Sequence, residues 1–138
     1  MDIIIYKQNY SDEYVKKHTN YLFIFGDNED GYGTGGQACI RYNSNAFGIP
    51  TKKHPDNNPE SFYNDKEFER NRMVIKKTLH KFKKIMINYD KIIFPEHGIG
   101  TGLSQLPKKA PKTFAYLKYK IHKLFNKIRK GSYKEIKW

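Results

Sequence analysis

Residues 21–28 read YLFIFGDN, and residues 31–36, shortly after them, read GYGTGG. The five apolar residues that open this stretch are typical of a strand buried on both faces, as in a mixed or parallel sheet covered by helices. Glycines then end the strand, and we expect a helix over residues 37–42. A strand, a glycine-rich loop and a helix in this order favour an α/β fold.

A second stretch repeats the same order. Residues 90–94, DKIIF, predict another buried strand, and the loop GIGTG follows at residues 98–102. A helix is then expected over residues 110–128, with Pro111 in the first turn, where the missing N–H of proline costs no hydrogen bond. The chain therefore shows a loose twofold echo of strand, glycine-rich loop and helix, and no further internal repeat.

Such loops suit phosphate groups. Main-chain N–H groups at a helix start have no intrahelical acceptor, and glycines let a phosphate approach them without an intervening Cβ. Two loops that follow neighbouring strands predict one shared pocket, because the carboxyl ends of strands in an open α/β sheet form the usual ligand crevice. Neither loop carries the Walker pattern or the Gly-x-Gly-x-x-Gly fingerprint, so kinase-like and hydride-transfer roles are disfavoured.

The other elements complete one domain, residues 1–138. Proline cannot donate to a strand ladder, so the strand at residues 46–49 is expected to stop at Pro50. The remaining expectations are a strand at residues 3–6, helices at 11–17 and 64–87, a surface loop at 52–59, and a tail at 132–138 that either packs or frays.

Composition narrows the class of protein. Lys and Arg outnumber Asp and Glu by 26 to 14, and the net charge of +12 favours polyanionic partners. No apolar run approaches the roughly 18 residues of a membrane span, and the N-terminus lacks a signal-peptide pattern, so we expect a cytoplasmic protein without membrane contact. The single Cys39 is expected to be a small buried residue on a helix. Five scattered histidines show no ligand spacing, so neither a metal nor a cofactor is expected.

Two pairs of segments carry a resemblance to a known family. Residues 25–28, FGDN, with residues 33–38, GTGGQA, resemble the first ligand loop of macro domains, and residues 93–102, IFPEHGIGTG, with Leu106 and Pro107 resemble the second. The resemblance implies a three-layer α/β/α fold with a central mixed sheet and glycine-rich loops at the strand C-terminal ends. Macro domains bind ADP-ribose and related metabolites, and some hydrolyse the bond that joins ADP-ribose to a protein or nucleic acid.

The resemblance also implies residue roles. Asn28 would contact the distal ribose, with Gly35 and Gly36 close to it, and the loop at residues 98–102 would hold the diphosphate. The paired glutamates that glycohydrolase-type relatives carry after the first glycine cluster are absent here. Binding of an ADP-ribose-like nucleotide is therefore the first expectation, and hydrolysis of an ADP-ribosyl linkage is the second.

Asp27, Asn28 and His97 are the candidate catalytic residues, since a loop imidazole near a diphosphate can act as a general base near neutral pH. Each also has a purely structural interpretation: the first two can cap the turn, and the histidine can bond to backbone. Lys52 and Lys53 either attract an anionic ligand into the pocket or only face solvent in a surface loop. The candidate ligand-binding residues are Gly26, Gly33, Thr34, Gly35, Gly36, Gln37, Glu96, Gly98, Ile99, Gly100, Thr101 and Gly102.

A different function stays open, that of a basic nucleic-acid-binding protein without enzymatic activity. The helix expected at residues 110–128 and the residues after it interleave lysine and arginine with aromatic side chains. The alternative for this helix is an amphipathic packing element whose lysines only face solvent. The sequence indicates no oligomeric state. The basic positions are Lys118, Lys120, Lys123, Lys127, Arg129 and Lys130, among Tyr116, Tyr119 and Phe125.

Overall fold

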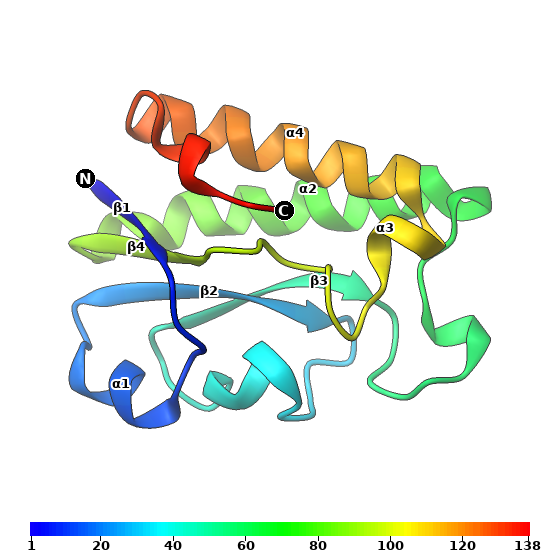
Figure 1. Ribbon diagram of the computed structural model, residues 1–138, viewed down its shortest axis with the longest axis horizontal. Coiled ribbons are helices and arrows are strands. Elements are labelled where there is room, and N and C mark those ends of the chain that lie inside the picture. The colour runs from blue at the N-terminus through cyan, green and yellow to red at the C-terminus, as the bar shows by residue number, and fades with distance from the viewer.

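The computed structural model describes residues 1–138 and contains one four-stranded sheet (Figure 1). The strands are β1 (Asp2–Tyr6), β2 (Tyr21–Asn28), β3 (Ala46–Lys52) and β4 (Lys91–Pro95), in the order β1-β4-β2-β3. All three neighbouring pairs are parallel. The chain is thus an α/β protein, as expected, but the expectation of a mixed sheet was wrong, because every connection between strands crosses over and returns to the same end.

The register brings both glycine loops to one edge of the sheet. β1 pairs with β4 from Asp2 opposite Lys91 to Tyr6 opposite Pro95, and β2 pairs with β4 up to Phe23 opposite Ile93. Since all four strands point the same way, their carboxyl ends lie together. The loops that leave β2 and β4 therefore start side by side.

Two strand boundaries differ from the expected ones. β2 continues through Gly26 and Asp27 to Asn28, and β3 continues through Pro50 to Lys52. Pro50 was expected to end its strand, but β3 lies at the edge of the sheet, where one side of the strand needs no ladder donor.

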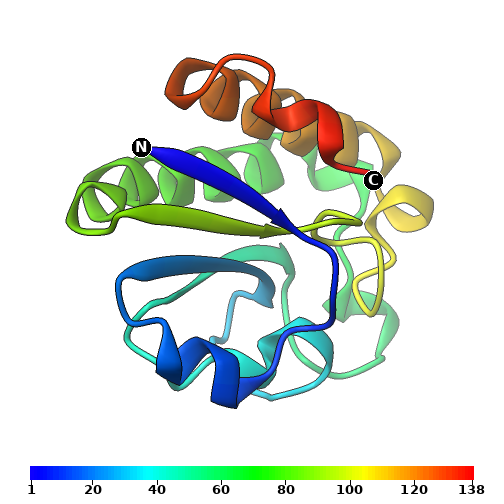
Figure 2. The same cartoon turned by 60° about the vertical axis from the view of Figure 1, so that its left-hand side comes forward.

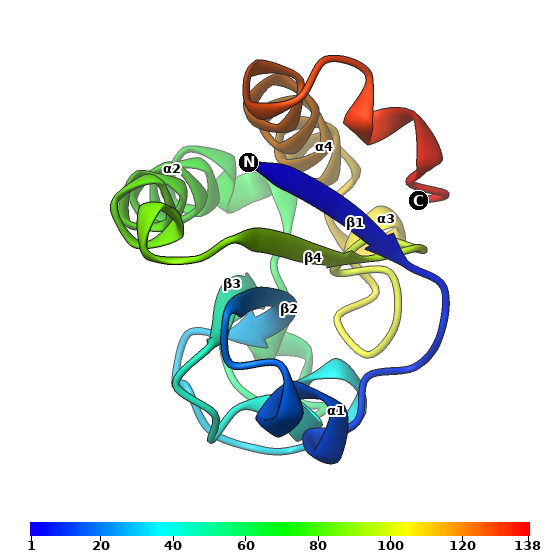
Figure 3. The same cartoon turned by 90° about the vertical axis from the view of Figure 1, so that its left-hand side faces the viewer.

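Helices cover both faces of the sheet (Figures 2 and 3). The helices α2 (Phe68–Ile85) and α4 (Pro111–Ile128) lie on one face, and α1 (Asp12–Lys17) lies on the other with a 3-10 helix, η1 (Gly36–Ile40). Alternation along β2 explains how both sides are filled: Leu22 and Ile24 belong to the larger core under α2 and α4, whereas Phe23 and Phe25 belong to the smaller core on the α1 side.

The long helix predicted at residues 64–87 divides into three parts: η3 (Asp65–Glu67), α2, and η4 (Met86–Asn88). The helix predicted at residues 37–42 is the short η1 instead. Further helical segments are η2 (Pro59–Ser61), α3 (Leu106–Lys109) and η5 (Ser132–Glu135). The helix α4 has no cap of its own, and the carboxylate of Asp65 accepts from the amides of Lys112 and Thr113 at 2.8 and 3.0 Å.

The C-terminal tail packs onto the sheet edge. The amide of Lys137 donates to the carbonyl of Glu96, and Ile136 is buried in the larger core. The Trp138 ring lies 5.7 Å from both Phe94 and Phe114, centroid to centroid. The tail thus closes over the end of β4. No helix in the structure has the length and apolar character that crossing a membrane requires.

Candidate functional site

The two glycine loops contact each other at the carboxyl edge of the sheet. A Cβ atom placed on Gly26 would lie 3.3 Å from the amide nitrogen of Gly100, so the two backbones are in close approach. Gln37 joins the loops: its Oε1 accepts from the Gly26 amide at 2.9 Å, and its Nε2 donates to the Gly98 carbonyl at 3.0 Å. Gln37, predicted as a ligand contact, is therefore the cross-link between the loops.

Both loops present main-chain donors that the fold leaves unused. None of the amides of residues 32–35 or of residues 99–104 donates to a main-chain carbonyl. Positive φ angles at Gly33 (97°) and Gly100 (80°) produce these turns, and only glycine adopts such angles without strain. Two runs of available N–H groups next to each other are the elements of an anion-binding site.

A cavity of about 130 Å³ lies between the loops. The end of β2 contributes Gly26, Asp27 and Asn28, and the residues directly after the second loop contribute Leu103 and Ser104. Its remaining lining residues are Gly33, Gly35, Ala38, Arg41, Lys52 and Pro55. The volume equals that of about four water molecules at roughly 30 Å³ each, so the cavity accommodates one phosphate-sized group.

A larger hollow of about 480 Å³ has Gln37 in its lining. It sits between the carboxyl ends of β1 and β4, whose chains leave toward opposite faces of the sheet, as the positions of α1 and α4 show (Figure 3). In open α/β sheets this arrangement marks the usual ligand crevice. The hollow is lined by Tyr6, Lys7, Gln8, Asn9, Tyr10, Gly36, Gln37, Pro95, Glu96 and His97.

The carboxylate of Asp27 is held by Arg41. The guanidinium donates to both carboxylate oxygens, at 2.9 and 2.5 Å, and the two side chains are only 12% and 8% exposed. One of these oxygens also accepts from the amide of Asn28 at 2.7 Å. The Asp27 carboxylate is thus already engaged, and its place in the site is to orient Arg41 at the cavity wall.

The side chain of Asn28 organises its own loop. Its Nδ2 donates to the Tyr32 carbonyl at 2.9 Å, and its Oδ1 accepts from the Gly31 amide at 3.0 Å. These are the turn-capping bonds that the structural interpretation of this residue requires. Asn28 lines the cavity while its amide shapes the loop around it.

Glu96 and His97 lie in the larger hollow, away from Asp27 and Asn28. The Nδ1 of His97 is 3.1 Å from the Lys137 carbonyl oxygen. A carbonyl can only accept, so Nδ1 carries the proton and the Nε2 of the neutral ring is left with a lone pair. That Nε2 lies 3.6 Å from the Glu96 carboxylate. The three candidate catalytic residues therefore belong to two adjoining spaces and not to one.

Some residues of the second loop pack against other parts of the fold, and others are exposed. Gly98 is covered by Trp138, whose Cζ3 would lie 2.6 Å from a Cβ at that position, and the Ile99 side chain is buried in the core. Thr101, expected to donate to phosphate, donates to the His97 carbonyl at 3.0 Å. At Gly102, by contrast, nothing lies within 4 Å of a Cβ.

The lysines and the cysteine named from the sequence all have structural partners. Burial lowers the pKa of Lys52, whose ammonium donates to the Asp56 carbonyl at 2.8 Å and lies over the Phe62 ring. Lys53 forms an ion pair with Glu67 at 2.6 Å. Cys39 lies half-buried in η1 and its thiol is 3.4 Å from the Tyr10 carbonyl. No three His, Cys, Asp or Glu side chains gather as metal ligands.

Sequence reasoning missed Arg41, Ser104 and the residues after β1. The position of Tyr6 and Lys7 at the carboxyl end of a predicted strand was a usable signal, because the same rule located the two glycine loops. Arg41 and Ser104 follow no motif. Ser104 is brought in by a 2.6 Å hydrogen bond between its hydroxyl and that of Thr51, 53 residues away.

Comparison with curated proteins and with solved structures finds no match. The sequence model of one family matches residues 5–120, a range that includes all four strands except the first residues of β1, and both glycine loops. The match ends within α4. Because it covers most of the sequence, the chain belongs to the family of unknown function DUF7831.

Proposed function

We propose that the chain binds ADP-ribose or a related nucleotide diphosphate derivative where the two glycine loops meet. The observation that carries this proposal is the close approach of Gly26 and Gly100, which sets two runs of unused amides beside one cavity. Lys52 lines that cavity and adds positive charge, while Arg41 in the same lining is paired with Asp27. This combination of amides and a cationic side chain favours a diphosphate over a neutral ligand.

The sizes of the two spaces suggest how such a ligand lies. The cavity near Asn28 suits one phosphate-sized group, whereas the hollow of about 480 Å³ falls within the roughly 300–1,000 Å³ of small-molecule sites. Tyr6 and Tyr10 line the hollow and offer ring surface for a nucleoside. In our proposal the diphosphate crosses the loops near Gln37, and the nucleoside occupies the hollow between β1 and β4.

The arrangement of layers supports the same proposal. In our proposal the architecture is macro-like and three-layered. It is supported by α2 and α4 on one face of the sheet, α1 with η1 on the other, and glycine loops at the strand carboxyl ends. The four strands are all parallel, which differs from the mixed sheet that the resemblance implies. A measurement of ligand binding therefore tests the macro-like interpretation together with the proposed ADP-ribose ligand.

Hydrolysis of an ADP-ribosyl linkage is the further part of the proposal, with His97 as general base. His97 lines the hollow, and its Nε2 lone pair would take a proton from a water that attacks the anomeric carbon of the ribose. The bond to the modified side chain breaks, and the departing group takes up that proton. Asp27 and Asn28 act as positioning residues, because their polar atoms already bond to Arg41 and to the loop.

Titration calorimetry with ADP-ribose, ADP, AMP and pyrophosphate tests binding. We expect ADP-ribose and ADP to bind and Gly102→Glu to weaken both at least tenfold, because the new carboxylate sits among the free amides while nothing in the fold obstructs it. Thr19→Glu adds the same charge in an exposed turn near the amino ends of the strands and should bind normally. A folded protein that binds none of the four ligands would refute the proposal.

Hydrolysis is tested by the release of ADP-ribose from an ADP-ribosylated protein. His97→Gln should abolish release and retain binding, because the amide cannot take the proton. If the wild-type protein binds ADP-ribose but releases none, the chain is a reader of the modification and the hydrolytic part of the proposal is wrong.

A further inference from the structure

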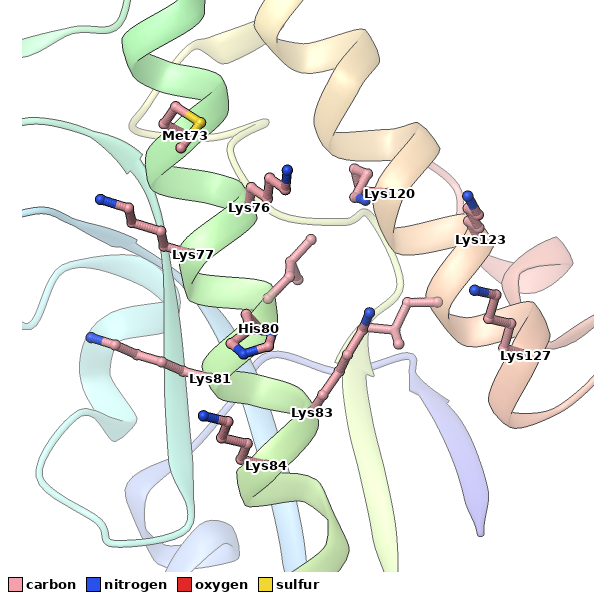
Figure 4. A pocket seen from close by; sticks show the side chains of 12 residues that line it. Met73, Lys76, Lys77, His80, Lys81, Lys83, Lys84, Lys120, Lys123 and Lys127 are labelled. Carbon is pink, nitrogen blue, oxygen red and sulfur yellow. The ribbon is translucent and has the colours of Figure 1, made fainter.

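A groove lined by lysines runs between α2 and α4 on the outer side of the helical layer (Figure 4). Its volume is about 650 Å³, larger than either space at the glycine loops. Leu79 and Leu124 contribute apolar surface, and Met73 and His80 lie on the α2 side. Eight lysines complete the lining: Lys76, Lys77, Lys81, Lys83 and Lys84 from α2, and Lys120, Lys123 and Lys127 from α4.

These lysines have no acidic partners. None of the ion pairs in the structure involves any of the eight. The sequence contains no Asp or Glu between Glu69 and Asp90, and none between Glu96 and Glu135. Apart from Glu69 in the first turn of α2, the two helices therefore carry no acidic residue.

The positive charges of the two helices act on one another. Burial, and after it the charges of Lys123 and Lys127 on the same helix and of Lys83 and Lys76 on the other, lower the pKa of Lys120. The helix dipole favours positive charge in the last turn of a helix, and this accounts for Lys83, Lys84 and Lys127. The other five stand earlier in their helices. A polyanion in the groove would neutralise charges on both walls at once.

The groove is remote from the glycine loops. Helix α2 leads from the carboxyl end of β3 to the amino end of β4, and α4 starts at the carboxyl end of β4, so both helices run back toward the amino ends of the strands (Figure 1). The lysines occupy the middle and last turns of both helices. The groove and the loops therefore lie toward opposite ends of the sheet.

We propose that this lysine groove binds the sugar–phosphate backbone of a nucleic acid without regard to base sequence. The charges form two rows, which extend about 12 Å along α2 from Lys76 to Lys84 and about 10 Å along α4 from Lys120 to Lys127, at 1.5 Å per residue. Phosphates of one duplex strand recur every ~3.4 Å along the axis, so such rows match several of them. A single phosphate group would need only a compact cluster of positive charges and not two rows.

The kind of side chain indicates the mode of recognition. No arginine lines the groove, and arginine is the residue that reads guanine edges in a bidentate manner. No Phe, Tyr or Trp lines it either, and such rings are the platforms that stack the bases of single strands. Lysine alone contributes point charges to phosphates, which give affinity that depends on salt and not on sequence. This nucleic-acid site is independent of the proposed nucleotide site.

Fluorescence anisotropy with two labelled duplexes of unrelated sequence tests the proposal over a range of salt concentrations. The wild-type protein should bind both equally. The variant Lys76→Gln/Lys83→Gln/Lys120→Gln should bind at least tenfold more weakly, and the slope of log affinity against log salt should become shallower by about 0.9 for each phosphate contact that is lost.

The matched control is Lys17→Gln/Lys66→Gln/Lys134→Gln, which removes the same net charge at exposed positions outside the groove. It should retain most of the affinity. Equal loss in both triple variants would mean that net charge alone attracts the duplex and would overturn the proposal.

Two further measurements separate this groove from other occupants and from the loops. Gly102→Glu should bind the duplexes as the wild-type protein does, whatever its affinity for ADP-ribose. Phosphatidylserine vesicles and polyglutamate serve as the alternative anions. If either binds in a groove-dependent manner and no duplex does, the groove serves a membrane or an acidic polypeptide, and the nucleic-acid proposal is wrong.

Discussion

The side-chain amide of Gln37 donates a 3.0 Å hydrogen bond to the carbonyl oxygen of Gly98, across 61 residues of sequence. The same amide accepts from Gly26 at the end of β2. One side chain thus holds the two glycine loops at a set separation and also lines the larger hollow. The loops form a site only as long as this bridge keeps them together.

Gln37→Leu removes both bonds and leaves the Gly26 amide and the Gly98 carbonyl without partners. We expect the free energy of unfolding to fall by about 1–3 kcal/mol, measured by urea denaturation. Affinity for ADP-ribose should fall as well, measured by calorimetry. As a control, Gln37→Glu keeps an acceptor for Gly26 but sets a carboxylate against the Gly98 carbonyl, so it should be destabilised too. A Gln37→Leu protein with unchanged stability and binding would contradict this role.

Gly98→Ala should dislodge the C-terminal tail, because the new methyl group would overlap the Trp138 ring and the φ of +75° disfavours any side chain. Trp138 is the single tryptophan of the chain, so its fluorescence reports on the tail directly. We expect a red-shifted emission and a lower midpoint of thermal unfolding. In a double-mutant cycle with Trp138→Ala the two effects should be smaller than additive, because the overlap no longer exists. Full additivity would mean that the two residues do not interact.

Arg41→Met should destabilise the fold by about 3–5 kcal/mol, since it leaves the buried Asp27 carboxylate without its partner. Arg41→Lys retains the charge but cannot make both bonds to the carboxylate, so its loss should be smaller. Chemical denaturation of the two variants and of Asp27→Asn measures the series. If Arg41→Met is as stable as Arg41→Lys, the pair contributes nothing specific to the fold.

Docking of the tail should weaken in mild acid. Burial, together with the nearby Lys118, lowers the pKa of His122, and its neutral Nε2 accepts from the Trp138 indole N–H at 2.7 Å. The unfolded chain therefore binds a proton more readily than the folded one. This contribution to stability is complete above about pH 6.5, the ordinary histidine value, and is lost as the pH falls toward the lower pKa of the folded state.

Trp138 fluorescence and the unfolding free energy, followed from pH 7.5 to 5 (~2.5 units), check this expectation. His122→Gln offers an amide oxygen to the indole and does not titrate, so its tail should stay docked over this range. If the Trp138 fluorescence of the wild-type protein does not change while His122 takes up a proton, protonation of His122 does not control docking of the tail.

Much of the fold could be predicted from local pattern. The apolar run from Leu22 to Phe25 and that from Ile92 to Phe94 are buried strands, and the glycines after them do form loops. Two boundaries were wrong for tertiary reasons. Pro50 does not end β3, because the edge of the sheet tolerates it, and β2 continues to Asn28, where it still pairs with β3.

The site could be predicted only in outline. The sequence indicated that two glycine loops lie at one edge of the sheet, but nothing local showed that Arg41 engages Asp27 or that Trp138 covers Gly98. Asn28 and Gln37 were named as site residues, but the sequence did not show that their side-chain amides shape and join the loops. Such partners are separated by up to 61 residues or lie beyond any motif, so local spacing does not reveal them.

By itself the sequence determined the elements and their polarity, because hydrophobic periodicity and glycine act over a few neighbouring residues. It also determined the excess of positive charge. Only the tertiary structure decided which groups share a space, since the packing of α2 against α4 brings Lys83 and Lys120 to one groove and strand pairing brings Gly26 to Gly100. Through-space contacts depend on the whole chain folding at once, and that is why the two candidate sites became visible only in three dimensions.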